Sequence, residues 1–311
     1  MIGVAAGVVV LAAIGLPHLL RLERTPAGFA AAIWLSVLLL RAMACLAAAV
    51  AAELYLPVTG LVTPLESWCV AGSTALSGHD AADFVLALPA LTLAASLCGV
   101  MAGLWRASRR VQTLLRTSVV GPGPDGSLVV ADGAMLVAVA GLRRPKVVIS
   151  AGALVELDDD ELLASLAHEQ GHIALRHRYL LVAGELARAV ARFLPGTRAA
   201  ARELLFSLER DADRYALERS HDPAVLASAI FKAARGSTAP AMLALGGGVV
   251  VRRARLLLEA GAQPAHLGLI ALAPVMAALV AASAIALPFV AHAGYHRSHE
   301  HGHACSTSHS V

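Results

Sequence analysis

Three side chains in the segment from His168 to His172 have the types and the spacing of a metal-dependent hydrolytic site. The segment reads His-Glu-Gln-Gly-His, so its two histidines are four residues apart. On a helix, residues four apart lie on one face, and both imidazoles can then reach a single metal ion. Glu169 would lie beside that ion, where it could take a proton from a water molecule. The pattern is typical of zinc peptidase sites.

A second acidic motif could supply the third protein ligand that a catalytic zinc ion usually has. Glu209 and Asp213 are four residues apart in the run from Ser207 to Ala216, and they share a face of a predicted helix. Glu209 could complete a set of two histidines and one glutamate. Asp213 could accept a hydrogen bond from the free ring nitrogen of a ligand histidine. Alternatively, Glu209, Asp211 and Asp213 form a solvated face that alternates with arginines.

The two motifs together resemble those of the membrane-embedded gluzincin zinc metallopeptidases. This group includes the HtpX-type quality-control proteases, the CAAX prenyl proteases and the protease module of BlaR/MecR-type antibiotic sensors. The resemblance rests on H-E-x-x-H at 168–172 and E-x-x-A-D at 209–213, and it covers roughly residues 106–265. It implies that His168, His172 and Glu209 bind one catalytic zinc ion. It further implies that Glu169 is the general base and that Asp213 orients a ligand.

A predicted helix carries the two histidines. Acidic residues fill positions 158–161, where a helix N-terminus is partly positive, and Asp158 with Glu161 has the spacing of a capping box. Upstream, the segments 127–131, 135–139 and 146–150 read as strands, and Asp132-Gly133 predicts a hairpin turn between the first two. In zincin-like folds an edge strand near the metal helix binds substrate backbone by strand addition. We expect one of these three strands to do so.

The composition excludes an ordinary soluble domain. The 311 residues are 58% hydrophobic and 15% charged, with a mean hydropathy of +0.69. Four segments are candidates to cross a bilayer core of about 30 Å. They are residues 1–17 (with 18–20 as an extension), 28–52, 84–105 and 267–290. The first lacks the basic start and cleavage site of a signal peptide, so we interpret it as an uncleaved span. The expected fold class is an α-helical membrane protein, with four transmembrane helices and an α+β zincin-like metalloprotease domain.

The charge distribution orients these spans. Basic clusters follow the first and third spans and precede the last, whereas residues 53–83 contain no Lys or Arg. The positive-inside rule then makes the protease cytoplasmic and the 53–83 segment external, within a multi-pass protein of the cell membrane. The predicted domains are listed by residue number: 1–105, three transmembrane helices with an external loop at 53–83; 106–265, the cytoplasmic zinc metalloprotease; 266–291, the fourth transmembrane helix; 292–311, a His-rich external tail.

Several residues admit two interpretations. Arg41 lies within the second predicted span, where a charge is costly. Either it marks a misplaced span boundary or snorkels to an interface, or it makes a polar contact between helices that could relay an external signal. The stretch 179–194 is too polar for a span, and we expect it to pack on the domain or to lie at the membrane surface. His177 is five residues beyond His172, off the ligand face, so we expect it on the surface or behind a ligand.

Two further groups of residues could serve the chemistry. A donor that stabilises the oxyanion is needed, and Tyr215, Arg219 and His221 are candidates by proximity in sequence only. In the C-terminal tail, histidines could form an auxiliary metal-binding tract; the residues are His296, His299, His301 and His303.

These features predict a membrane zinc endopeptidase that cleaves a protein or peptide at the cytoplasmic face of the lipid bilayer. Two roles compete: quality control of membrane proteins, and signal-triggered cleavage of a cytoplasmic transcriptional repressor. The net charge of +3 is accounted for by membrane-flanking arginines, so no nucleic-acid partner is indicated. The alternative is a metal-sensing or metal-binding membrane protein with a degenerate or latent protease domain. An intact Glu169 argues against that alternative.

Overall fold

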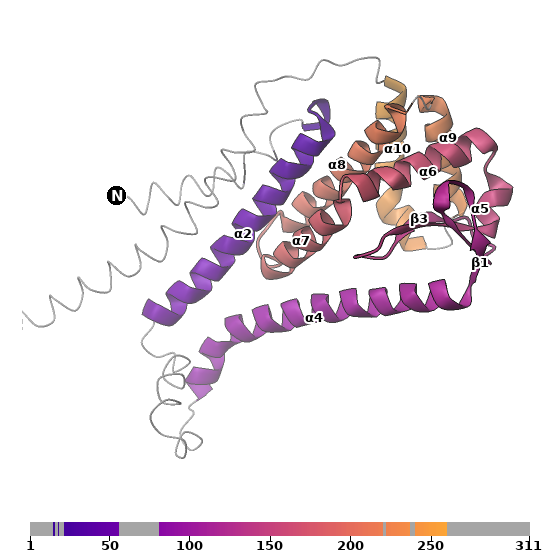
Figure 1. The fold of residues 1–311 in the computed structure, drawn as a ribbon. Coiled ribbons are helices and arrows are strands. Elements are labelled where there is room, and N and C mark those ends of the chain that lie inside the picture. The colour runs from indigo at the N-terminus through magenta and orange to yellow at the C-terminus, as the bar shows by residue number, and fades with distance from the viewer. Residues whose placement is uncertain are drawn as a thin grey trace, which may run out of the picture.

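The computed structural model of this chain describes residues 22–55, 81–219, 222–236 and 240–259, together with residues 15 and 18. Its helices are α2 (Ala27–Tyr55), α4 (Ala81–Thr117), α5 (Ala151–Glu156), α6 (Asp159–Ala174), α7 (His177–Val190), α8 (Thr197–Leu217), α9 (Pro223–Gly236) and α10 (Pro240–Glu259). Its strands are β1 (Val119–Pro122), β2 (Leu128–Val130), β3 (Val137–Ala140) and β4 (Lys146–Ser150). Short 3-10 turns are η1 (Leu22–Arg24) and η2 (Pro124–Gly126). The described part is mostly helical and contains a small mixed sheet (Figure 1).

The four strands form one sheet in the order β1-β2-β4-β3. Strand β2 runs parallel to β4, whereas β1 is antiparallel to β2 and β3 is antiparallel to β4. The predicted strands correspond to β2, β3 and β4, and β1 has no counterpart among the predictions. Strand β3 is therefore an edge strand, and it contacts α6, the helix that carries the two histidines.

The predicted hairpin turn at Asp132-Gly133 is wrong, because β2 and β3 do not pair with each other. Instead, the hydroxyl of Ser150 at the end of β4 holds the chain that follows this turn. It donates to the carbonyl of Ala134 at 2.6 Å and accepts from the amide of Leu136 at 2.9 Å. The chain thus passes the end of β4 and places β3 on its far side. An Asp-Gly pair favours a turn locally, but long-range contacts select the partner of the next strand.

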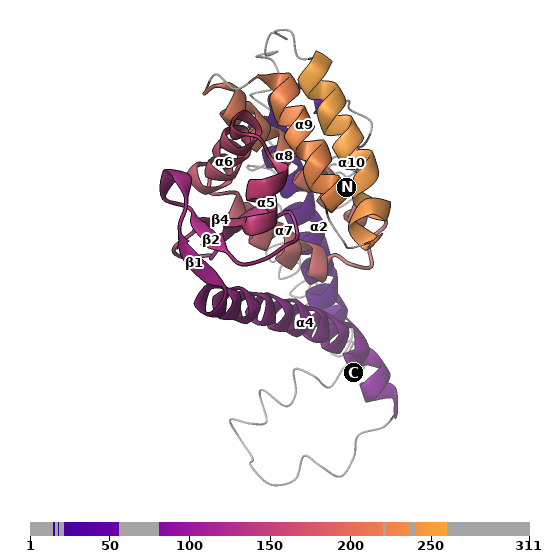
Figure 2. The same ribbon diagram turned by 90° about the vertical axis from the view of Figure 1, so that its right-hand side faces the viewer.

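Helix α6 begins where the acidic run predicts. The Asp158 side chain accepts from the amide of Glu161 at 2.8 Å, and the Glu161 carboxylate accepts from the amide of Asp158 at 3.1 Å. This is the predicted capping box. Glu161 also binds Lys232 at 2.5 Å and Ser228 at 2.6 Å, both on α9. The start of the histidine-bearing helix is therefore fixed to a second helix, which lies beside α10 (Figure 2).

An apolar core lies between α2 and the helices α7 and α8. Its buried members are Leu22, Ala30, Ala31, Ile33, Trp34, Val37, Leu38, Leu40, Ala42, Ala187, Ala200, Leu204 and Leu208. The stretch Ala27–Leu46 of α2 is long and apolar enough to cross a membrane, but half of it is buried inside the protein. Helix α2 is therefore a packing partner of α8, the helix that carries Glu209.

Arg41 lies in this interface and is 3% exposed. Its guanidinium donates to the backbone carbonyl of Pro195 and, at 3.3 Å, to the hydroxyl of Thr197. Pro195 belongs to the turn between α7 and α8, and Thr197 is the first residue of α8. Of the two interpretations of Arg41, snorkelling does not hold, and the polar contact between helices is confirmed. Relay of an external signal through Arg41 stays a prediction.

Helix α4 contains the other apolar stretch of membrane-spanning length among the described residues, Leu91–Thr113, of which 6% is buried. Its exposed apolar side chains include Leu91, Met101 and Trp105. Helix α7, which corresponds to the predicted stretch 179–194, packs on α4, and Arg192 just beyond its end donates to the Ser96 hydroxyl at 3.0 Å. That stretch therefore packs on the domain.

Only part of the predicted membrane topology falls on described residues. The second and third predicted spans, 28–52 and 84–105, lie within α2 and α4, whose apolar stretches of membrane-spanning length are Ala27–Leu46 and Leu91–Thr113. Outside the described residues lie the first span apart from residues 15 and 18, most of the 53–83 loop, the fourth span, and the tail with its four candidate histidines. The predicted boundary between residues 105 and 106 falls inside α4, which continues into the domain as one helix. Four transmembrane helices stay a prediction.

Candidate metal centre

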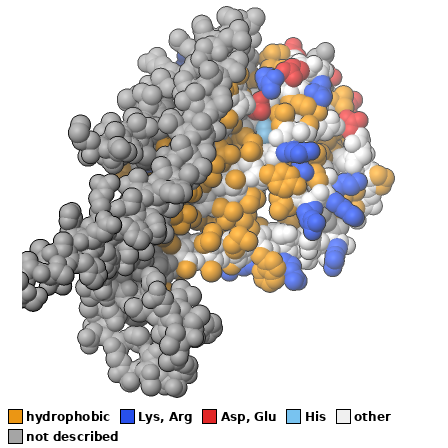
Figure 3. Space-filling model, turned by 60° about the vertical axis from the view of Figure 1, so that its left-hand side comes forward, with side chains coloured by type: hydrophobic (Ala, Val, Ile, Leu, Met, Phe, Trp, Pro, Cys, Tyr) orange, Lys and Arg blue, Asp and Glu red, His pale blue; other side chains and the backbone are white. Residues whose placement is uncertain are grey.

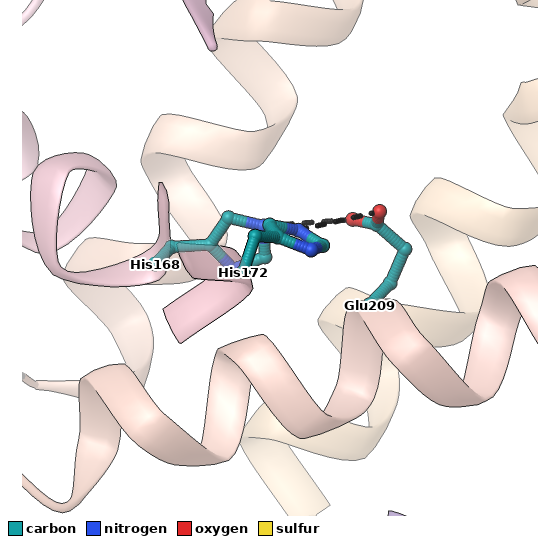
Figure 4. Close-up of side chains that lie close together, drawn as sticks. All are labelled: His168, His172 and Glu209. Atoms are coloured by element: carbon teal, nitrogen blue, oxygen red, sulfur yellow. Dashed lines mark hydrogen bonds and ion pairs between the residues drawn. The ribbon is translucent and has the colours of Figure 1, made fainter. Parts of the chain in front are cut away.

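Helices α6 and α8 bring His168, His172 and Glu209 together (Figure 4). One nitrogen of each histidine and one carboxylate oxygen all lie within 4.8 Å of one another. The Nε2 atoms of the two histidines are 3.2 Å apart. Oε2 of Glu209 lies 3.5 Å from Nε2 of His168, and Oε1 lies 3.6 Å from Nε2 of His172. Two imidazoles and one carboxylate are a donor set of catalytic zinc sites. Within the described part of the chain, no other group of such residues converges in this way.

Gly171 allows the two helices to approach closely enough for this convergence. A Cβ atom added at Gly171 would lie 3.1 Å from the Cβ of Tyr215 and 3.2 Å from the Cα of Ala212, both on α8. The second contact is with backbone, which cannot rotate away. A larger residue at this position would therefore separate α6 from α8 and move the histidines away from Glu209.

Asp213 lies behind His168, as the sequence predicted. Its Oδ1 is 2.9 Å from Nδ1 of His168, and its side chain is buried. A carboxylate on Nδ1 holds the ring proton there and leaves Nε2 to face the other donors. Asp211 is buried as well. The alternative interpretation of this acidic run as a solvated face is therefore wrong, because α8 packs with these carboxylates inward.

His177 lies behind His172, with the two Nδ1 atoms 2.9 Å apart. It is 1% exposed, and its Nε2 is 3.4 Å from Oδ2 of Asp211. The prediction that His177 lies off the ligand face assumed that the helix of His168 and His172 continues through residue 177. The helix in fact ends at Ala174, and Arg176 adopts a left-handed conformation with φ of 57° where α7 begins. This turn folds His177 back against His172.

Arg253 of α10 is a cation at the centre, with its side chain 11% exposed, that the sequence analysis missed. Its guanidinium donates to Asp213 at 2.6 and 3.0 Å and lies 2.7 Å from Oε2 of Glu209. In the sequence it is one of several arginines that precede a predicted span, and no local signal distinguishes it. Its positive charge offsets the repulsion between two neighbouring carboxylates, buried Asp213 and half-buried Glu209.

The electrostatics of the three candidate ligands differ. Burial opposes a charge on His168, but its hydrogen bonds with Asp213 and Glu209 outweigh burial and raise its pKa to about 10. Burial lowers the pKa of His172 to about 4. Burial acts to raise the pKa of Glu209, yet the hydrogen bond with His168 and the charge of Arg253 hold this pKa well below the usual range. In the metal-free protein near neutral pH, His168 is therefore a cation protonated on both ring nitrogens, whereas His172 is neutral and Glu209 is ionised.

Glu169 lies between this set and the sheet. Burial raises the pKa of its carboxyl to about 7, although the charge of nearby His168 acts in the opposite direction. Its carboxylate accepts a hydrogen bond from the backbone amide of Val139 in β3. A carboxyl group with such a pKa can accept and release a proton near neutral pH, as a general base must.

Among the described residues, no hydrogen bond or ion pair joins Tyr215 or Arg219, two of the suggested oxyanion donors, to the three candidate ligands. The guanidinium of Arg219 lies 3.3 Å from the ring centroid of Tyr215, so these two side chains stack on each other. His221 lies outside the described residues.

Comparison with known proteins gave one finding. Residues 109–206 match the family model described as Peptidase family M48. This segment contains the 168–172 motif and ends three residues before Glu209. A search of curated proteins and a search of solved structures gave no match. The family match and the converging side chains of His168, His172 and Glu209 together support a metallopeptidase domain of the gluzincin type in this chain.

Proposed function

We propose that this chain is a membrane-bound zinc endopeptidase in which His168, His172 and Glu209 hold one zinc ion and Glu169 is the general base. The observation that carries the proposal is the convergence of these three donors, from two helices, within 4.8 Å. The residues fit the ion: both Nδ1 atoms have partners on their far side, so both Nε2 atoms can offer lone pairs to a metal.

When bound, a zinc ion supplies Lewis acidity toward water and the scissile carbonyl. Glu169 would take a proton from the attacking water and deliver it to the amine that leaves. Its pKa of about 7 in the metal-free protein suits both transfers. Asp213, through His168, and Arg253, through Glu209, would keep the ligands in place while the substrate is exchanged.

Strand β3 is the part of the sheet best placed to bind the substrate backbone. The carbonyl of Leu136 accepts from the amide of Ser150, so alternate residues from 136 onward face β4. Val137 and Val139 therefore present their amides and carbonyls to the free edge. The amide of Val139 reaches Glu169 there. An extended peptide added along this edge would pass the general base, which supports β3 as the substrate strand.

Membrane attachment is supported by the surface of α4. Its exposed apolar side chains lead to Trp105, which is 60% exposed, and Arg109 stacks on that ring at 4.8 Å. An aromatic ring beside arginines at the end of an apolar helix is typical of a membrane–water interface. Apolar side chains also gather on one side of the described part, with Lys and Arg side chains spread over the other (Figure 3). Under the positive-inside rule, these arginines favour a peptidase on the cytoplasmic side of the membrane.

The test is cleavage of unfolded casein by detergent-purified full-length protein, together with zinc analysis. Wild type, Glu169→Gln and the control Glu156→Gln, an exposed glutamate before α6, are compared. We expect one zinc per chain in all three, and cleavage by wild type and the control only. Absence of zinc from wild type would refute the proposal.

The same assay separates the two biological roles. Cleavage of casein favours quality control of unfolded proteins. Stoichiometric zinc without cleavage favours an enzyme that a signal must activate, with a cytoplasmic regulator as substrate. A metal-sensing protein would instead lose its zinc on deletion of residues 292–311.

A further inference from the structure

His177 is a buried histidine for which the proposed chemistry has no role. It is 1% exposed and lies at the first residue of α7, outside the peptidase motif itself. Both of its ring nitrogens lie near a partner: Nδ1 is 2.9 Å from Nδ1 of His172, and Nε2 is 3.4 Å from Oδ2 of Asp211. A histidine that only fills space would not need a polar partner on each side.

The proton positions along this chain of contacts follow from the role of His172. If Nε2 of His172 binds a metal, the ring is neutral and its proton must be on Nδ1. That N–H can donate only to an unprotonated Nδ1 of His177. The proton of His177 is then on Nε2, where it can donate to the carboxylate of Asp211. A single arrangement of protons therefore satisfies both histidines.

Asp211 is itself held from two sides. Arg214 donates to its Oδ1 at 2.9 Å. On the other side, α2 packs against it so closely that a Cβ added at Gly28 would lie 3.1 Å from Oδ2. The side chain of Asp211 is 8% exposed, so its carboxylate has little freedom to turn away from His177.

We propose that His177, held by Asp211, is a positioning residue that fixes the tautomer and ring orientation of His172 for metal binding. This inference rests on the proposed function, because it takes His172 to be a metal ligand. The two ligand histidines are then oriented differently. A carboxylate binds His168 directly, whereas a histidine intervenes between His172 and its carboxylate.

Two substitutions of His177 separate positioning from packing. In His177→Asn, the amide oxygen lies as many bonds from Cα as Nδ1 does, so it can still accept from His172. In His177→Gln, the amide nitrogen lies as many bonds from Cα as Nε2 does, so it can still reach Asp211 but not His172. Zinc affinity is measured on full-length protein by chelator competition. The visible spectrum of the Co²⁺-loaded protein reports the ligand geometry.

We expect His177→Gln to lose about 10- to 100-fold in zinc affinity, the usual effect of removing such a partner, and to shift the Co²⁺ spectrum. His177→Asn should stay within about threefold of wild type, as should the control Glu218→Gln, which removes the other carboxylate partner of Arg214. Thermal unfolding of the metal-free proteins checks that each variant folds.

The outcomes are distinct. Equal losses in the Asn and Gln variants would mean that His177 only fills space, and wild-type affinity in the Gln variant would mean that it is dispensable. Either result overturns the inference and leaves the proposed function standing. Failure of wild type to bind zinc or Co²⁺ would instead overturn the proposed function.

Discussion

Zinc binding to this protein should compete with a proton. In the metal-free protein the pKa of His168 is raised to about 10, because its hydrogen bonds with Asp213 and Glu209 outweigh the effect of burial. A metal ligand must offer a lone pair, so His168 has to release this proton when zinc binds. The apparent affinity for zinc should therefore rise with pH until the pKa of His168 is reached.

The size of the effect follows from the distance between pH and pKa. At pH 7 the pKa of His168, about 10, lies about 3 units above the pH of the solution. Competition by the proton therefore weakens apparent zinc binding about a thousandfold, or about 4 kcal/mol. Between pH 7 and 9 the affinity should rise about tenfold per pH unit. Below pH 7 the rise should steepen, because the charge of the ion would lower the pKa of the neighbouring Glu169 carboxyl, about 7 without metal, and release its proton as well.

The assay is chelator competition at several pH values between 6 and 9, combined with calorimetry in buffers of different ionisation enthalpy. About one proton per zinc should be released at pH 8. Asp213→Asn should lower the pKa of His168 and flatten the slope, whereas Asp160→Asn, an exposed position on the same helix as His168, should not. A wild-type slope near zero between pH 7 and 9 would refute the reasoning, because His168 would then be neutral without metal.

Three further predictions concern the supports of the site. Gly28→Ala should weaken zinc affinity severalfold in chelator competition, because the added Cβ would displace Asp211. The control Gly103→Ala should not, since a Cβ added there meets nothing within 4 Å. Arg41→Leu should cost about 1–3 kcal/mol of unfolding free energy in denaturant titrations, because the carbonyl of Pro195 and the hydroxyl of buried Thr197 each lose a donor. Asp158→Ala should cost about 1 kcal/mol in the same titrations, since the α6 cap is lost.

The sequence by itself determined the features that depend on neighbouring residues. The capping box at Asp158 and the helix that follows it are decided within a few residues, and the structure has both. The spacing of His168 and His172 fixes their common face, because the helix has a regular period. The partnership of these histidines with Glu209 was predicted from a motif, and the structure brings the three side chains together.

Only the tertiary structure decided which distant groups meet at the centre. Arg253 reaches Asp213 from another helix. In the sequence, nothing distinguishes it from the other arginines that precede the last predicted span. His177 reaches His172 because the chain reverses at Arg176, which a periodicity argument cannot foresee. The hairpin prediction failed for the same reason: Asp132-Gly133 does turn the chain, but the side chain of Ser150 places β3 on the far side of β4. Local preferences are set by a few adjacent residues, whereas these contacts depend on how whole helices and strands pack, and no short stretch of sequence encodes that.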